Sequence, residues 1–131
     1  MHQLGLSDQI IKLDRNIRFV GIVNDRGEVI EGGFQQGIRP LLDGTDEQQM
    51  YVQSLANVTT FQQFSGRLGK VRYSITEHEK VVLLTVPLSD GILCVSASSR
   101  VDPIKLRDRV LKAVKAGGKT RSARKKSNAK G

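Results

Sequence analysis

Few side chains in this sequence have the type and spacing that catalysis or metal binding requires. His78 stands between two glutamates, a grouping that could bind a metal ion, but the other histidine is His2, and no cysteine or histidine stands at ligand spacing. Cys94 could act as a nucleophile with His78 as its base, but it lies in the apolar run of residues 91–95, where burial disfavours a thiolate. We therefore predict no catalytic residue, no metal site and a structural role for Cys94.

Two further patterns argue against enzyme chemistry. Residues 32–37 contain three glycines, but they lack the Lys-Ser/Thr ending of a phosphate-binding loop and do not join a strand to a helix in a parallel sheet. The adjacent acids Asp46 and Glu47 stand in the first turn of a predicted helix, where the helix dipole favours them without any acid/base role. The sequence therefore predicts a protein that is not an enzyme and needs no cofactor.

The strongest local signal is positive charge near the C-terminus. The net charge is +8, and residues 116–131 contain six cations and no acid. Because this segment has no apolar residue larger than Ala, we predict a disordered basic tail over residues 117–131. Such a tail attracts the phosphates of DNA or RNA, although it could also serve solubility alone. The predicted nucleic-acid contacts are Lys119, Arg121, Arg124, Lys125, Lys126 and Lys130.

The remaining composition predicts a cytoplasmic protein with no membrane partner. A single cysteine excludes an internal disulfide and indicates a reducing compartment. No signal-peptide pattern is visible, and the longest apolar run, residues 81–88, is too short for a bilayer and is interrupted by Thr85 and Pro87. No lipidation signal or amphipathic helix accompanies the basic tail.

The first half of the chain predicts a short helix and a hairpin. Ser7 is a suitable N-cap for a helix that ends near residues 14–16. Residues 17–23 and 28–31 are predicted strands, joined by a turn in which Gly27 supplies positive φ. Glycines and a proline then predict an irregular loop over residues 32–44.

The second half predicts one long helix, three strands and a last helix. Thr45 and Gln48 form a capping-box pattern, and apolar residues that include Phe61 and Phe64 continue at helical spacing until Gly66. Residues 71–75, 81–88 and 92–97 are predicted strands, and a helix capped by Asp102 ends at residues 117–118. We therefore expect a single α/β domain over residues 1–116, with a five-stranded antiparallel sheet flanked by helices in the order α-β-β-α-β-β-β-α.

A self-association surface is predicted from the long helix and the strand that follows it. The outer face of the helix is rich in glutamine and almost uncharged, which is typical of a packing surface. The strand over residues 71–75 alternates apolar and polar residues, as expected at a sheet edge. A symmetric dimer would use both elements. The predicted interface residues are Gln49, Gln53, Val71, Tyr73 and Ile75.

Two segments resemble recurrent patterns of the roadblock family of dynein light chains and their prokaryotic relatives. Residues 19–30 are similar to the family's first hairpin, with its Asp-x-Gly turn, and residues 80–95 resemble its fourth and fifth strands, joined at an Asp-Gly turn after a Pro-Leu pair. The order of elements also resembles the family over residues 7–115. The chain looks similar, too, to uncharacterised small archaeal proteins of this fold.

The resemblance implies a non-enzymatic module that dimerises through its central helix and an edge strand and regulates or anchors a small GTPase. The sequence departs from the family in its glutamine-rich central helix, its longer loop over residues 32–44 and its basic tail. We therefore expect an interaction and regulatory module of the roadblock type. The alternative is a nucleic-acid-associated protein that binds DNA or RNA through its tail.

Overall fold

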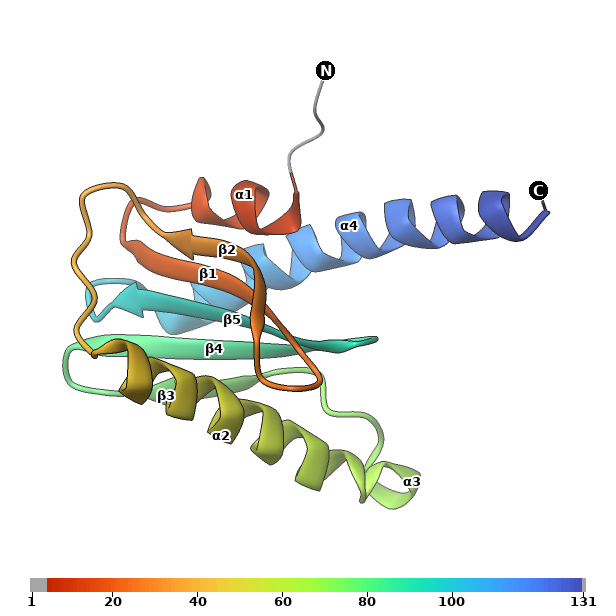
Figure 1. Cartoon of the computed structure of the whole chain (residues 1–131), viewed down its shortest axis with the longest axis horizontal. Helices are drawn as coiled ribbons and strands as arrows, with labels where there is room; N and C mark the ends of the chain where they lie inside the picture. The colour runs from red at the N-terminus through yellow and green to blue at the C-terminus, as the bar shows by residue number, and fades with distance from the viewer. Residues whose placement is uncertain (1–4, 131) are drawn as a thin grey trace.

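A computed structural model describes the backbone of residues 5–130 and the side chains of residues 5–117. Five strands form one antiparallel sheet in the order β2-β1-β5-β4-β3, and helices cover both of its faces (Figure 1). This confirms the predicted fold class. The strands are β1 (Ile17–Asn24), β2 (Val29–Phe34), β3 (Ser74–Glu77), β4 (Val81–Leu88) and β5 (Gly91–Ser98), and the helices are α1 (Leu6–Ile11), α2 (Gly44–Gln62), α3 (Ser65–Leu68) and α4 (Pro103–Lys130).

The hairpin β1–β2 forms where the sequence predicts it, but β2 is longer than predicted. The side-chain oxygen of Asn24 accepts hydrogen bonds from the amides of Arg26 (2.9 Å) and Glu28 (3.0 Å), and Gly27 has φ of 81°. Gly32, predicted to begin a loop, instead pairs with Gly21 across the ladder. A Cβ atom on Gly32 would lie 2.0 Å from the Val20 carbonyl oxygen, so glycine here permits close strand approach rather than ending the strand.

The larger core lies between the sheet and the helices α1 and α4. Alternate residues of β4 and β5 point to this side, where they meet Ile10 of α1 and Leu106 and Val110 of α4. All three of these helical residues are at most 4% exposed. Burial on this scale, at about 25 cal/mol per Å² of apolar surface, makes this face the main source of stability.

The smaller core lies on the opposite face, under α2. Tyr51 of α2 stacks on Phe19 of β1 with ring centroids 5.4 Å apart, and Val58 packs with Val23 and Ile92. Tyr51 and Val58 are the buried residues of this 19-residue helix. The sheet is therefore covered unequally, and most of the surface of α2 faces away from it.

The N-terminal caps of α1 and α2 differ from those predicted. The residue before α1 is Gly5, and Ser7 lies inside the helix, where its amide (3.0 Å) and hydroxyl (2.6 Å) donate to Glu31 of β2. Asp43, rather than Thr45, caps α2 by accepting a hydrogen bond from the Asp46 amide at 2.8 Å. Asp is as good a cap as Thr and stands two residues earlier, so α2 begins earlier.

Helix α4 begins where predicted but continues beyond its predicted end. Asp102 accepts hydrogen bonds from the amides of Ile104 (2.9 Å) and Lys105 (3.2 Å), as a capping residue does. The helical backbone then passes through the two glycines at residues 117–118 and reaches Lys130. Each glycine costs a helix only about 1 kcal/mol relative to Ala, and the residues that follow are mostly good helix formers. The division between a domain over residues 1–116 and a disordered tail over residues 117–131 stays a prediction.

Candidate interaction surface

After the two acids of its first turn, Asp46 and Glu47, helix α2 presents no charged side chain. Between Gln48 and Gly66 the sequence has no charged residue, although 26% of the whole chain is charged. Gln49 and Gln53, both predicted interface residues, are exposed on this helix, and Gln53 donates a hydrogen bond of 3.0 Å to Asn57 one turn later. Protein interfaces are depleted of charge at their centres, so this face has the composition of a contact surface.

Large apolar side chains are exposed along the same helix and the short α3. Val52 is 45% exposed, Phe61 60%, Phe64 53% and Leu68 79%. The sequence placed Phe61 and Phe64 among the apolar residues that continue at helical spacing, and in the structure both rings are exposed. In Figure 1 the C-terminal end of α2 and the short α3 extend away from the sheet, in agreement with the exposure of these side chains. Together with Gln49 and Gln53, these four residues are called the uncharged surface below.

β3 lies at the edge of the sheet, as predicted, but it begins later than predicted. It starts at Ser74, so Val71 and Tyr73 precede the strand, while Ile75 lies within it opposite Leu84. The amide of Val71 donates to the side chain of Gln62 at 3.1 Å, which ties this segment to the end of α2. The backbone groups on the outer edge of β3 have no neighbouring strand in the sheet order.

The structure separates the predicted interface residues into two groups. Gln49 and Gln53 lie on α2, on one side of the sheet, whereas Tyr73 and Ile75 pack against the core under α1 and α4 on the other side. The sequence pattern gave their spacing along the chain but not the face to which each side chain points. The two groups therefore lie on opposite sides of the sheet.

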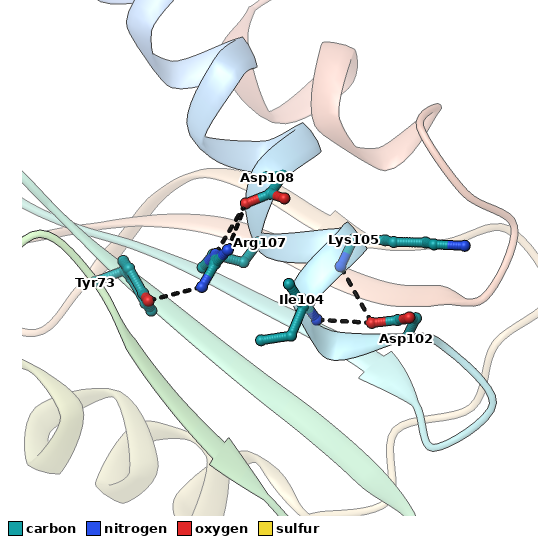
Figure 2. Close-up of polar contacts among 6 residues, drawn as sticks. All are labelled: Tyr73, Asp102, Ile104, Lys105, Arg107 and Asp108. Atoms are coloured by element: carbon teal, nitrogen blue, oxygen red, sulfur yellow. Dashed lines mark hydrogen bonds and ion pairs between the residues drawn. The ribbon is translucent and has the colours of Figure 1, made fainter.

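Tyr73 is held by Arg107 of α4 (Figure 2). The guanidinium donates a hydrogen bond of 2.9 Å to the Tyr73 hydroxyl and lies 5.2 Å from the ring centroid, within range of a cation–π interaction. It also binds the carboxylate of Asp108 through Nε (2.9 Å) and Nη2 (2.7 Å). The hydrogen bond to Asp108, followed by that to Tyr73, raises the pKa of Arg107. This contact joins the segment before β3 to α4.

The residues considered for catalysis lie apart from one another. Cys94 is 8% exposed in the core under α2, as predicted, and burial raises the pKa of its thiol to about 12. His78 is exposed in the β3–β4 turn, where its amide donates to the Val81 carbonyl at 2.8 Å. Within residues 5–117, no group of three or more metal-ligating side chains is present. The structure therefore brings no nucleophile and base together at Cys94.

The glycines of residues 32–37 and the acids Asp46 and Glu47, which the sequence analysis considered for chemistry, also have structural roles. A cavity of about 440 Å³ lies between α1 and β2, beside the glycines of residues 32–37. Glu31 at the wall of this cavity already accepts hydrogen bonds from the amide and hydroxyl of Ser7.

Glu47 lies in the first turn of α2, after the capping residue Asp43. Burial, followed by the nearby Asp43, raises the pKa of Glu47. Asp46 and Glu47 occupy the first turn of α2, which is where the helix dipole favours acids.

The six predicted nucleic-acid contacts lie on the last part of α4. The helix gives their backbone positions, but their side chains lie outside the described residues. None of the helices in the part of the chain that the structure describes is both long and apolar enough to cross a membrane. The six residues are Lys119, Arg121, Arg124, Lys125, Lys126 and Lys130.

Comparisons with known proteins agree with this fold. A family profile described as "Family of unknown function (DUF6659)" matches residues 7–120, and no curated protein matches the chain. Similar solved structures include a Roadblock/LC7 domain from Streptomyces avermitilis, with 17% identity, 85% of this chain and 92% of that chain covered, and a TM-score of 0.60. Myxococcus xanthus MglB has 20% identity, coverage of 89% and 93%, and a TM-score of 0.67. An MglB with a tetrameric arrangement has 11% identity, coverage of 87% and 83%, and a TM-score of 0.70. These TM-scores, over more than four fifths of each chain, establish a roadblock-like fold.

Proposed function

This chain belongs to the DUF6659 family of unknown function and has a roadblock-like fold, and we propose that it is a non-enzymatic interaction and regulatory module that self-associates. The observation that carries this proposal is the uncharged surface. Phe61 of α2, Phe64 between the two helices and Leu68 of α3 each expose more than half of their area, and the chain has no charged residue from Gln48 to Gly66. Exposed apolar side chains gathered on one element mark contact sites rather than ordinary solvated surface.

We propose a symmetric pair of chains that meet through α2 and the outer edge of β3. An edge strand presents unpaired amide and carbonyl groups, which a second copy of the same strand satisfies in an antiparallel pair. The two α2 helices would then cover the exposed rings of Phe61 and Phe64. The glutamines of the outer face, Gln49 and Gln53, supply hydrogen bonds at the rim without the desolvation cost of a charge.

A small GTPase is the protein partner that the roadblock resemblance implies. The structure supports this only through the fold, since the three solved structures described above are each less than 25% identical to the chain. The proposal predicts that the isolated protein hydrolyses no GTP, because the glycine-containing residues 32–37 lack the Lys-Ser/Thr ending with which a phosphate-binding loop holds a nucleotide. The role of the module is to hold or position the partner.

The test of self-association is light scattering after gel filtration. We expect a mass of about twice the 14.5 kDa chain for the wild type at micromolar concentration. Phe61→Arg places a cation on the uncharged surface and should weaken the dimer at least about tenfold, or about 1.4 kcal/mol. The matched control is Ile30→Arg, which places the same cation on an apolar residue of β2, 64% exposed at the opposite edge of the sheet.

Three results bear on the proposal separately. A monomeric wild type contradicts self-association, and equal weakening by both variants contradicts the location of the interface. Capture experiments with the wild type as bait, followed by mass spectrometry, test the partner. Recovery of a GTP-binding protein that the Phe61→Arg variant retains would place the GTPase site away from the uncharged surface.

A further inference from the structure

All of the excess positive charge of this protein lies in the later part of α4. Residues 109–131 contain nine cations and no acid, whereas the preceding 108 residues contain 12 cations and 13 acids. Because α4 continues past residues 117–118, these nine cations do not belong to a tail alone. They follow one another on the same helix that packs on the sheet.

Within the described part of α4, the cations gather on the face opposite the core. Lys105, Lys112 and Lys115 are all exposed, while Leu106 and Val110 on the other side are buried. The spacing of Lys105, Arg109, Lys112 and Lys115 is four, three and three residues, which keeps them on one side of an α-helix. Lys119 follows Lys115 by a further four residues in the same helix.

The acids of α4 and its cap do not neutralise these lysines. Asp102 accepts the amides of Ile104 and Lys105 as the N-cap, and the carboxylate of Asp108 is held by Arg107 (Figure 2). The guanidinium of Arg109 already has two partners: it donates a hydrogen bond to the Leu13 carbonyl, and its Nη1 lies 3.9 Å from Oδ2 of Asp14. No ion pair joins Lys105, Lys112 or Lys115 to any side chain within residues 5–117.

We propose that the outward face of α4, from Lys105 to Lys130, binds the phosphate backbone of a nucleic acid duplex. The described cations Lys105, Lys112 and Lys115 form one end of this site, and the helical positions of Lys119, Lys126 and Lys130 continue the same side of α4. The 25-residue rise from Lys105 to Lys130 is about 37 Å, close to one turn of a duplex. Phosphates lie about every 1.7 Å along the duplex axis, so a helix of this length meets many of them.

The chemistry of α4 favours a nucleic acid over an anionic membrane. A helix that lies on a bilayer must insert an apolar face, and residues 117–131 contain no apolar residue larger than Ala. The apolar residues of the earlier part, such as Leu106 and Val110, are already buried against the sheet. Phosphate contact requires cations alone, and the absence of aromatic residues from α4 predicts binding that is nearly indifferent to base sequence.

The test measures fluorescence anisotropy of labelled DNA and RNA duplexes of equal length with the full chain, from about 50 to 200 mM salt. The variant Lys105/Lys112/Lys115→Gln removes three contacts that contribute about 0.9 each to the slope of log K against log salt. Over this range of salt, the factor by which the affinity of the variant decreases should therefore be about 40 times smaller than the factor for the wild type. At low salt the variant should bind more weakly than the wild type. The same three lysines changed to Arg should retain wild-type binding.

The control variant Lys70/Arg72/Lys80→Gln removes the same charge near β3, and each variant is checked for an unchanged melting temperature. Binding that is lost equally in the control and the α4 variant would show a mere net-charge effect and overturn the site. Unchanged binding in the α4 variant would overturn it as well. Stronger binding to vesicles that contain phosphatidylserine than to either duplex would replace the nucleic acid with a membrane. Stronger binding to either the DNA or the RNA duplex would support the proposal and identify which nucleic acid the protein prefers.

Discussion

Cys94 shows how its surroundings determine the behaviour of a single residue. Its thiol packs among apolar side chains beneath α2, and burial holds the pKa at about 12 instead of the ordinary 9.0. The neighbouring phenol of Tyr51 has its pKa raised as well, first by burial and then by Glu47 and Cys94. Both groups therefore stay protonated in the folded protein at pH values where the unfolded chain would ionise.

This difference predicts that the protein loses stability at alkaline pH. The unfolded thiol releases its proton near pH 9 and the folded thiol near pH 12, so the stabilising contribution of Cys94 is complete below pH 9 and is lost between those values. The loss approaches about 1.4 kcal/mol per pH unit within this window. Urea unfolding at pH 8 and pH 10 measures it, and Cys94→Ala should show a smaller decrease. An equal decrease in Cys94→Ala would assign the effect to other groups.

At the residue scale, the sequence predicted some contacts and could not predict others. Asp102 was predicted as a cap because Pro103 follows it, and the structure confirms that cap. Asp43 was not predicted, because Thr45 matches a capping pattern equally well and only packing decides between adjacent starts. The hydrogen bond from Ser7 to Glu31 joins residues 24 positions apart, and no local pattern carries that information.

At the scale of elements, β2 shows how glycines can continue a strand. The backbone of Gly32 has φ of 106° and lies against Val20 and Gly21 of β1, whereas a Cβ atom on Gly33 would meet nothing within 4 Å. The sequence pattern could not distinguish this from a loop, since glycine is common in both settings. The distinction depends on how closely the neighbouring strand approaches.

These two glycines give a matched pair of substitutions. Gly32→Ala should destabilise the protein by about 2 to 4 kcal/mol, because its Cβ would clash with a carbonyl oxygen and its φ disfavours an L-residue. Gly33→Ala should change the free energy of unfolding by no more than about 1 kcal/mol. Denaturant unfolding of both variants measures the difference. Similar values for the two would mean that β2 does not lie against β1 as described.

Helix α2 shows a second limit at this scale. Helical spacing predicted the helix, and the structure confirms it. The spacing did not separate its buried residues, Tyr51 and Val58, from the exposed Phe61 and Phe64, because periodicity indicates the side of the helix on which a residue lies and not where the sheet beneath it ends. An exposed ring and a buried ring have the same sequence signature until the neighbouring element is known.

At the scale of the whole molecule, the sequence predicted one antiparallel sheet and the order of the elements, except for the short α3. Turn residues and apolar runs placed all five strands, with errors of a few residues at their ends. The end of α4 was predicted wrongly because two glycines suggest a stop, although each opposes a helix by only about 1 kcal/mol. The sequence did not predict that Tyr73 and Gln49 lie on opposite sides of the sheet, because only the three-dimensional packing determines this.

The last part of α4 should contribute little to the stability of the fold. Residues 119–131 include no apolar side chain larger than Ala, so their removal exposes no core. A chain that ends at Gly118 should keep its melting temperature within about 2 °C of the full chain, as differential scanning calorimetry would show. A decrease of more than about 5 °C would mean that these residues pack on the body of the protein.

The placement of α2 and α4 on opposite faces of one sheet has a consequence for valency. In the proposed dimer, which joins two chains through α2, both α4 helices would lie on the faces turned away from the contact. With the proposed site on each α4, such a pair would be bivalent: once one basic helix is bound, the second would sample the same polymer at an effective concentration set by the distance between the helices. Avidity of this kind would increase with self-association, so a weak single site on α4 would become a strong attachment only in the assembled protein.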